Sequence, residues 1–113
     1  MPLFERVRIE IYLPDSPNLP KYEAFLNLMR HEMTWAFGGC SIIPGVRGTY
    51  RSTMNSLIED RVNILYTDLP FSLEKQFDLV SKHADTLHEA VADALEEETI
   101  LVTITRIYWA GGQ

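Results

Sequence analysis

The sequence has a single cysteine and no long apolar run. Cys40 has no partner for an intramolecular disulfide, and no Cys/His spacing typical of zinc ligands surrounds it. No apolar stretch is long enough to span a bilayer, and the first residues lack the basic and apolar segments of a signal peptide. We therefore expect a cytoplasmic protein that uses neither a metal nor another cofactor.

Positive charge is also scarce. Residues 1–61 carry seven lysines and arginines and seven carboxylates, whereas residues 62–113 carry three and nine, so the net charge of −6 belongs to the second half. A nucleic-acid surface needs a basic stripe that replaces condensed counterions, and this sequence has none. We therefore expect neither nucleic acid nor a membrane as a partner.

The composition is that of an ordinary globular protein. Of the 113 residues, 46% are hydrophobic and 23% are charged, which is enough apolar content for one buried core. We expect a single domain that comprises residues 1–113.

Periodicity predicts the first two elements. Residues 6–13 alternate between apolar and polar side chains, which is typical of a half-buried strand. From residue 21 onward, apolar residues recur every three or four positions, and this spacing predicts a helix with one buried stripe. Gly38 and Gly39 should end that helix.

A second set on the same helix lies beside the main stripe. Leu28, His31 and Trp35 follow one another at helical spacing. We interpret them as part of a broad face that is buried in the monomer. Contact of Leu28 and Trp35 with another subunit is the alternative.

The middle of the chain predicts a long hairpin. Residues 40–51 form one strand interrupted by Pro44 and Gly45, which require a bulge or an edge position. A polar turn at residues 52–56 then leads into a strand at residues 57–67.

The last two elements are a helix and a strand. Ser72 is a candidate N-cap for a helix that runs to residue 97, and Phe77 and Val80 belong to its expected apolar stripe. Residues 99–109 then alternate as a strand.

This order predicts a ferredoxin-like α+β fold. Right-handed crossovers place four strands in one antiparallel sheet with both helices on the same face. The helices should cover one set of side chains, which comprises Val7, Ile9, Ile11, Val62, Ile64 and Val102. The open face should carry Arg6, Arg8, Glu10, Tyr12, Arg61, Asn63, Leu65, Thr67, Thr103, Thr105 and Ile107. Because that face is partly apolar, we expect self-association through it, and a solvated sheet face is the alternative.

Arginines and one carboxylate cluster at the predicted hairpin. Arg47, Arg51 and Arg61 could bind a small anion through paired hydrogen bonds, with Tyr50 lining the pocket. Glu59 could orient the ligand or act as a base. Cross-strand ion pairs that fix the hairpin register are the alternative explanation.

An enzymatic function is the second hypothesis. Glu59 or His31 would then supply acid or base chemistry, without a metal, in a cleft near Tyr50. Pro2 also superficially resembles the N-terminal proline of the tautomerase family, which would imply an isomerase. Cys40 is better explained as a small buried residue than as a nucleophile.

The glycine-rich middle third resembles small bacterial ferredoxin-like domains of unknown function. The resemblance rests on Phe37-Gly38-Gly39-Cys40-Ser41, on Gly45-Val46-Arg47-Gly48-Thr49-Tyr50-Arg51 and on Ile58-Glu59-Asp60-Arg61-Val62. It implies the same fold and no assigned activity. The first functional hypothesis is a non-enzymatic, homo-oligomeric binding or regulatory module with a small anion near the hairpin arginines, by analogy with trimeric nitrogen-regulatory-type proteins of this fold.

Overall fold

The computed structural model describes residues 3–15, 22–95 and 100–110. Six elements follow in the order β1 (Leu3–Pro14), α1 (Tyr22–Phe37), β2 (Ser41–Arg51), β3 (Leu57–Leu69), α2 (Phe77–Leu95) and β4 (Leu101–Ala110). Pro2 and the acidic run at residues 96–98 lie outside the described residues. None of the helices in the described part of the chain is long and apolar enough to cross a membrane.

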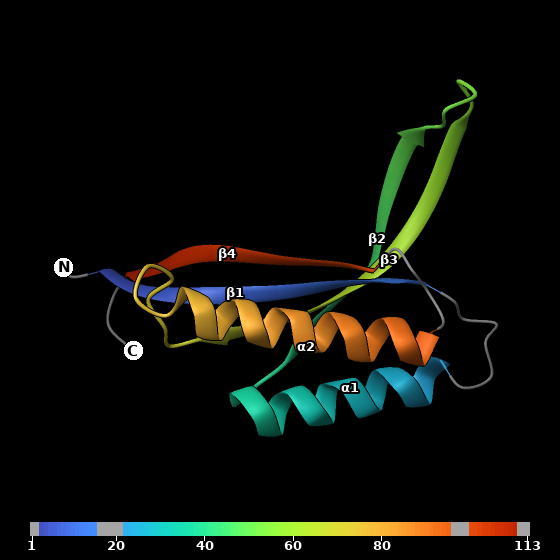
Figure 1. Cartoon of the computed structure of the whole chain (residues 1–113). Helices are drawn as coiled ribbons and strands as arrows, with labels where there is room; N and C mark the ends of the chain where they lie inside the picture. Colours follow the sequence, from blue (N-terminus) through green and yellow to red (C-terminus); the bar gives the residue numbers. More distant parts are fainter. Residues whose placement is uncertain (1–2, 16–21, 96–99, 111–113) are drawn as a thin grey trace.

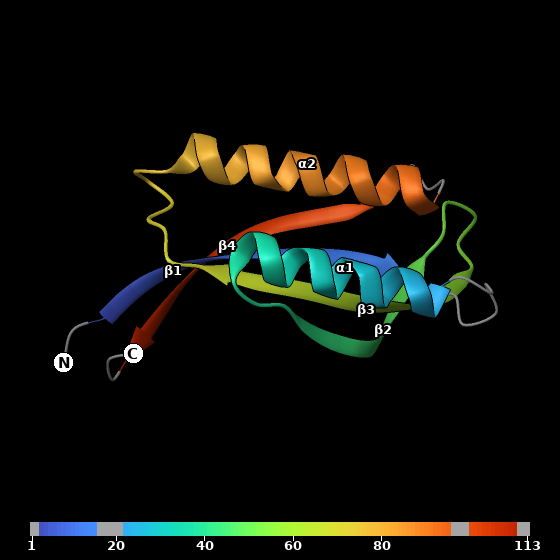
Figure 2. The same ribbon diagram turned by 90° about the horizontal axis from the view of Figure 1, so that it is seen from below.

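The four strands form one antiparallel sheet in the order β2-β3-β1-β4. Both helices lie across the same face of this sheet (Figure 1), and they run side by side when the molecule is seen from below (Figure 2). The predicted ferredoxin-like fold is therefore confirmed. The opposite sheet face carries no element of the described chain, and it is called the open face here.

The β2–β3 hairpin projects beyond the body of the domain (Figure 1). Its register shifts between Ile43 and Val46, and Gly45 has a φ of 63°, which favours glycine. The predicted bulge is thus confirmed, and Ser52 and Ser56 close the turn through a backbone hydrogen bond of 2.8 Å. The radius of gyration is 15.7 Å, against about 13 Å for a compact domain of this length, in keeping with a hairpin that leaves the body.

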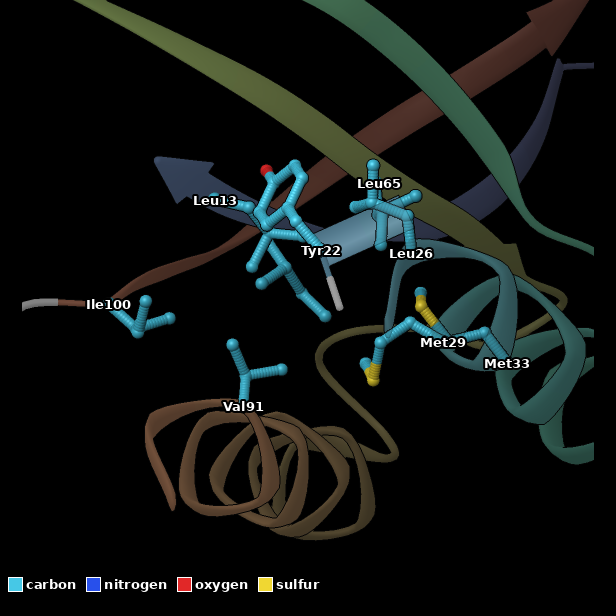
Figure 3. Close-up of a cluster of buried hydrophobic side chains, with 9 residues drawn as sticks. Leu13, Tyr22, Leu26, Met29, Met33, Leu65, Val91 and Ile100 are labelled. Atoms are coloured by element: carbon cyan, nitrogen blue, oxygen red, sulfur yellow. The ribbon is translucent and has the colours of Figure 1, made fainter. Parts of the chain in front are cut away.

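The core lies between the helices and the sheet. Alternation in β1 places Val7, Ile9, Ile11 and Leu13 against the helices, where all four are fully buried. Figure 3 shows one cluster, in which α1 meets side chains from three strands or their ends and from α2. Its labelled members are Leu13, Tyr22, Leu26, Met29, Met33, Leu65, Val91 and Ile100.

The predicted face assignment of β3 was wrong. Leu65 pairs with Ile11, and because directly paired residues share a face, Leu65 lies beneath the helices and is fully buried. Asn63 and Thr67 lie beneath them too. Val62, Ile64 and Tyr66 therefore belong to the open face. Arg61 has the same parity as Asn63, so it does not share that face either.

The start of α2 was also predicted wrongly. The helix begins at Phe77, and residues 72–76 form a separate turn. The side chain of Gln76 accepts a hydrogen bond from the Ser72 backbone at 2.8 Å, and the Leu73 backbone N–H donates to Glu5 of β1 at 2.7 Å. The Leu73 N–H, which would be an unpaired first-turn donor if the helix began after Ser72, is therefore satisfied by a tertiary contact with β1.

Three apolar helix residues are more exposed than expected. Leu28 is 56% exposed and Trp35 is 78% exposed, so the interpretation of a broad helix face buried in the monomer was wrong. Phe77 is 57% exposed as well, since the helix only begins there. The apolar side chains that α1 does bury are Tyr22, Leu26, Met29 and Met33.

The buried hydroxyl of Tyr22 gives the fold a predicted sensitivity to alkali. It donates to the Pro14 carbonyl and accepts from Asn63 at 3.0 Å, and burial raises the pKa of the phenol above its ordinary 10.0. The neutral form thus stabilises the fold below about pH 10, and this contribution is lost as the pH rises through the raised pKa. Urea unfolding from pH 8 to 11 should show a steeper stability loss for the wild type than for Tyr22→Phe. Parallel pH profiles would contradict this assignment.

Candidate functional site

A cavity of about 420 Å³ lies on the hairpin. β2 and β3 run beside each other here, and alternate residues of each strand share a face. The lining residues are Arg47, Gly48, Thr49, Glu59, Asp60 and Arg61. Three predicted site residues, Arg47, Glu59 and Arg61, are thus brought together.

The cross-strand register sets like charges opposite each other. Arg47 pairs directly with Arg61, and Glu59 pairs with Thr49. None of the ion pairs among the described residues joins β2 to β3, so the cross-strand ion pairs of the alternative explanation are not seen there. Two facing arginines destabilise a hairpin unless another group neutralises them.

One carboxylate partly offsets this repulsion. Asp15, just after β1, lies 3.8 Å from Nε of Arg61, and its backbone N–H donates to the Arg61 carbonyl at 2.9 Å. Among the described residues, no carboxylate oxygen lies within 4.0 Å of the Arg47 guanidinium. Arg47 is also exposed, so its charge remains available to a ligand.

The base of the hairpin is held by Asn63. Its side-chain oxygen accepts from the backbone N–H of Gly45 at 3.0 Å, and its amide donates to Asp15 and Tyr22 at 3.3 and 3.0 Å. A Cβ at Gly45 would lie 3.2 Å from the guanidinium of Arg61. Asn63 thus ties the bulge, and with it the position of Arg61, to the start of α1.

Two other predicted site residues, Arg51 and His31, are not among the described residues that line the hairpin cavity. Arg51 is exposed and pairs with Leu57 nearer the tip, while the backbone of Tyr50 pairs with Ile58. His31 is an exposed residue of α1, and its ring lies 6.1 Å from that of Trp35. The structure therefore does not bring His31 and Glu59 into one cavity, and the enzymatic function stays a prediction.

A second cavity, of about 460 Å³, was missed by the sequence analysis. It lies where α1 leads into β2, near the ends of β3 and β4. Its lining includes Arg6, Gly39, Cys40, Tyr66, Asp68 and Trp109. The Arg6 guanidinium lies 5.7 Å from the centre of the Trp109 ring, a cation–π contact. The α1–β2 cavity therefore combines a positive charge with aromatic rings.

An ion pair organises the sheet beside the α1–β2 cavity. Arg8 donates two hydrogen bonds to Asp68, at 2.7 and 3.0 Å, and stacks over Tyr66 at 4.2 Å. The hydrogen bonds that Arg8 donates to Asp68 raise the pKa of its guanidinium. Burial raises the pKa of the Cys40 thiol, so this cysteine is a poor nucleophile near neutral pH.

Metal-binding side chains do not gather in the part of the chain that the structure describes. No group of three or more His, Cys, Asp or Glu residues is placed to hold an ion there.

Comparisons with known proteins support the fold. No protein-family model and no curated protein matches the sequence. Among solved structures, the chain is similar to CPII, a nitrogen regulatory PII-like protein from Thiomonas intermedia bound to ADP, AMP and bicarbonate, with a TM-score of 0.53 and 13% identity. That match covers 97% of this chain and 100% of that chain.

Two CutA1 proteins are similar to the same extent. The divalent cation tolerance protein CutA1 from Thermus thermophilus has a TM-score of 0.51 and 18% identity, over 97% of this chain and 88% of that chain. CutA1 from Oryza sativa has a TM-score of 0.50 and 13% identity, over 97% and 84%. At these identities the likeness concerns the fold alone.

Proposed function

We propose that this chain is the subunit of a homo-oligomeric binding or regulatory module that holds a small organic anion at the hairpin arginines. The observation that carries the proposal is the direct opposition of Arg47 and Arg61 beside the hairpin cavity. Guanidinium groups bind carboxylate and phosphate oxygens through paired hydrogen bonds. An anion between the two side chains would replace their repulsion with two attractive contacts.

The choice of test ligands draws on a structural neighbour. The Thiomonas PII-like protein is described as bound to ADP, AMP and bicarbonate. All three are small anions, and two of them also carry a flat base. The α1–β2 cavity, with Arg6 beside Trp109, is the competing position for a ligand of that kind.

Self-association is supported by the open face of the sheet. Strand parity places an apolar cluster there, near the base of the hairpin. This open-face cluster comprises Tyr12, Ile43, Val46, Val62, Ile64 and Leu101. Ile43 and Leu101 are exposed, and large exposed apolar patches mark interaction surfaces. The apolar surface continues onto the hairpin, since Ile58 has the same parity as Val62 and is exposed.

The anion site is tested by thermal shift. We expect ADP, AMP or bicarbonate to stabilise the wild type by about 2.7 kcal/mol at one hundred times its Kd. Arg47→Ala and Arg61→Ala should each weaken binding at least tenfold, because each removes one charged donor. Arg30→Ala, an exposed arginine of α1, is the matched control and should leave the shift unchanged.

Two outcomes would contradict the site. Stabilisation that survives in the Arg47→Ala/Arg61→Ala double variant would remove the hairpin as the binding position. Loss of the shift in Arg6→Ala alone would move the ligand to the α1–β2 cavity.

A further inference from the structure

An apolar groove runs between the two helices. It has a volume of about 430 Å³, and all its lining residues come from α1 and α2. Met29, Met33 and Leu87 form part of its lining and also belong to the core. Thioether side chains adapt to different partners, which makes a methionine floor suitable for binding an apolar surface.

The α1 side of this interhelical groove is unusually apolar for a helix surface. Leu28 lines the groove and is 56% exposed. Trp35 follows it two helical turns later on the same side of α1 and is still more exposed. Exposed tryptophan and leucine side chains beside a groove are typical anchors of protein interfaces.

The groove is bordered by negative charge. Glu32 lines it directly, between Leu28 and Trp35. On α2, Asp93 lies two turns after the lining residue Thr86, so it is on the same side of the helix, and its carboxylate is exposed. The exposed Lys82, next to His83, lies toward the other end of the groove. The two carboxylates belong to an acidic protein whose excess of carboxylates lies in residues 62–113.

We propose that the interhelical groove docks an amphipathic helix of a partner protein, with an apolar stripe flanked by lysines or arginines. A groove between two helices accepts the ridge of a third helix, whose anchors recur at i, i+3, i+4 and i+7. Ala36, Ala90 and Ala94 line the groove and leave room for close approach. Flanking cations on the incoming helix would lie against Glu32 and Asp93.

The charge pattern favours this occupant over two others. A second copy of the chain would bring the same carboxylates against each other, and like charges at an interface are strongly unfavourable. An anionic lipid surface would be repelled for the same reason. The groove is lined by α1 and α2, and both helices lie on the side of the sheet opposite the open face (Figure 1), so it is independent of the proposed self-association.

The test uses two labelled synthetic peptides on the full chain. Both are amphipathic helices of about 18 residues, long enough to be helical alone, with leucines on one face and either lysine or glutamate elsewhere. By fluorescence anisotropy, the lysine peptide should bind at least tenfold more tightly than the glutamate peptide. Leu28→Asp and Asp93→Lys should each weaken the lysine peptide at least fivefold.

A matched control separates docking from general attraction to an acidic protein. Asp85 is an exposed carboxylate of the same helix, but it lies about two and a half turns from Ala94 and so faces the other way. Asp85→Lys should therefore leave the affinity within twofold of the wild type. An equal loss in Asp85→Lys and Asp93→Lys would overturn the proposal, as would a lower sedimenting mass of Leu28→Asp, which would identify the occupant as a second copy.

Discussion

Replacing Leu65 with alanine should destabilise the protein by about 2–5 kcal/mol. Leu65 is fully buried, pairs with Ile11 and contacts the core cluster beneath α1. Removing its side chain leaves a cavity as well as lost transfer free energy, and a close-packed core relaxes only partly around such a cavity. For a domain of this size the loss is a large fraction of the total stability.

Urea denaturation measures this loss, with Leu28→Ala as the control. Leu28 is the same residue type on the exposed surface of α1, so its replacement should change the stability by less than about 0.5 kcal/mol. If the two variants were equally stable, Leu65 would not lie beneath the helices, and the observed face assignment of β3 would be wrong.

The sequence could not reveal the faces of β3, although it predicted those of β1. In β1 every second residue is apolar, so the alternation has one solution. In β3, Val62, Ile64 and Leu65 are apolar on both faces. The polar residues that suggested the solvent side are instead buried and hydrogen-bonded: Asn63 to Tyr22 and Gly45, and Thr67 to the Gly39 carbonyl at 2.7 Å.

The two cavities also differ in how far the sequence could predict them. Arg47 and Arg61 were predicted as neighbours because a hairpin is a local structure whose turn fixes the register. The α1–β2 cavity joins Arg6, Tyr66 and Trp109, which come from three strands far apart in the sequence. Recognising it required Tyr66 on the open face, whereas the sequence pattern had placed Val62 and Ile64, which share the face of Tyr66, beneath the helices.

Helical periodicity has a similar limit. It identified both amphipathic helices, because the apolar spacing is strong over residues 22–36 and 80–95. It could not give the width of the buried stripe, which depends on how much of each helix the sheet covers. Leu28 and Trp35 lie outside the buried stripe of α1, and Leu28 lines the interhelical groove instead.

The second large effect concerns the open face. Leu101 belongs to the open-face cluster and is 54% exposed, so an aspartate at this position would not disturb the fold of the isolated subunit. Placed within an apolar interface between copies, however, the same carboxylate would be desolvated without a partner. Leu101→Asp should therefore dissociate the oligomer while leaving its circular dichroism spectrum unchanged.

The proposed module depends on a sheet whose uncovered side is occupied by another copy of the chain. Sedimentation equilibrium at micromolar concentration should give the wild type a mass of at least twice 13.0 kDa. It should return Leu101→Asp to the monomer mass and leave Leu28→Asp, the same change on α1, assembled. A wild-type protein that sediments as a monomer would contradict the account.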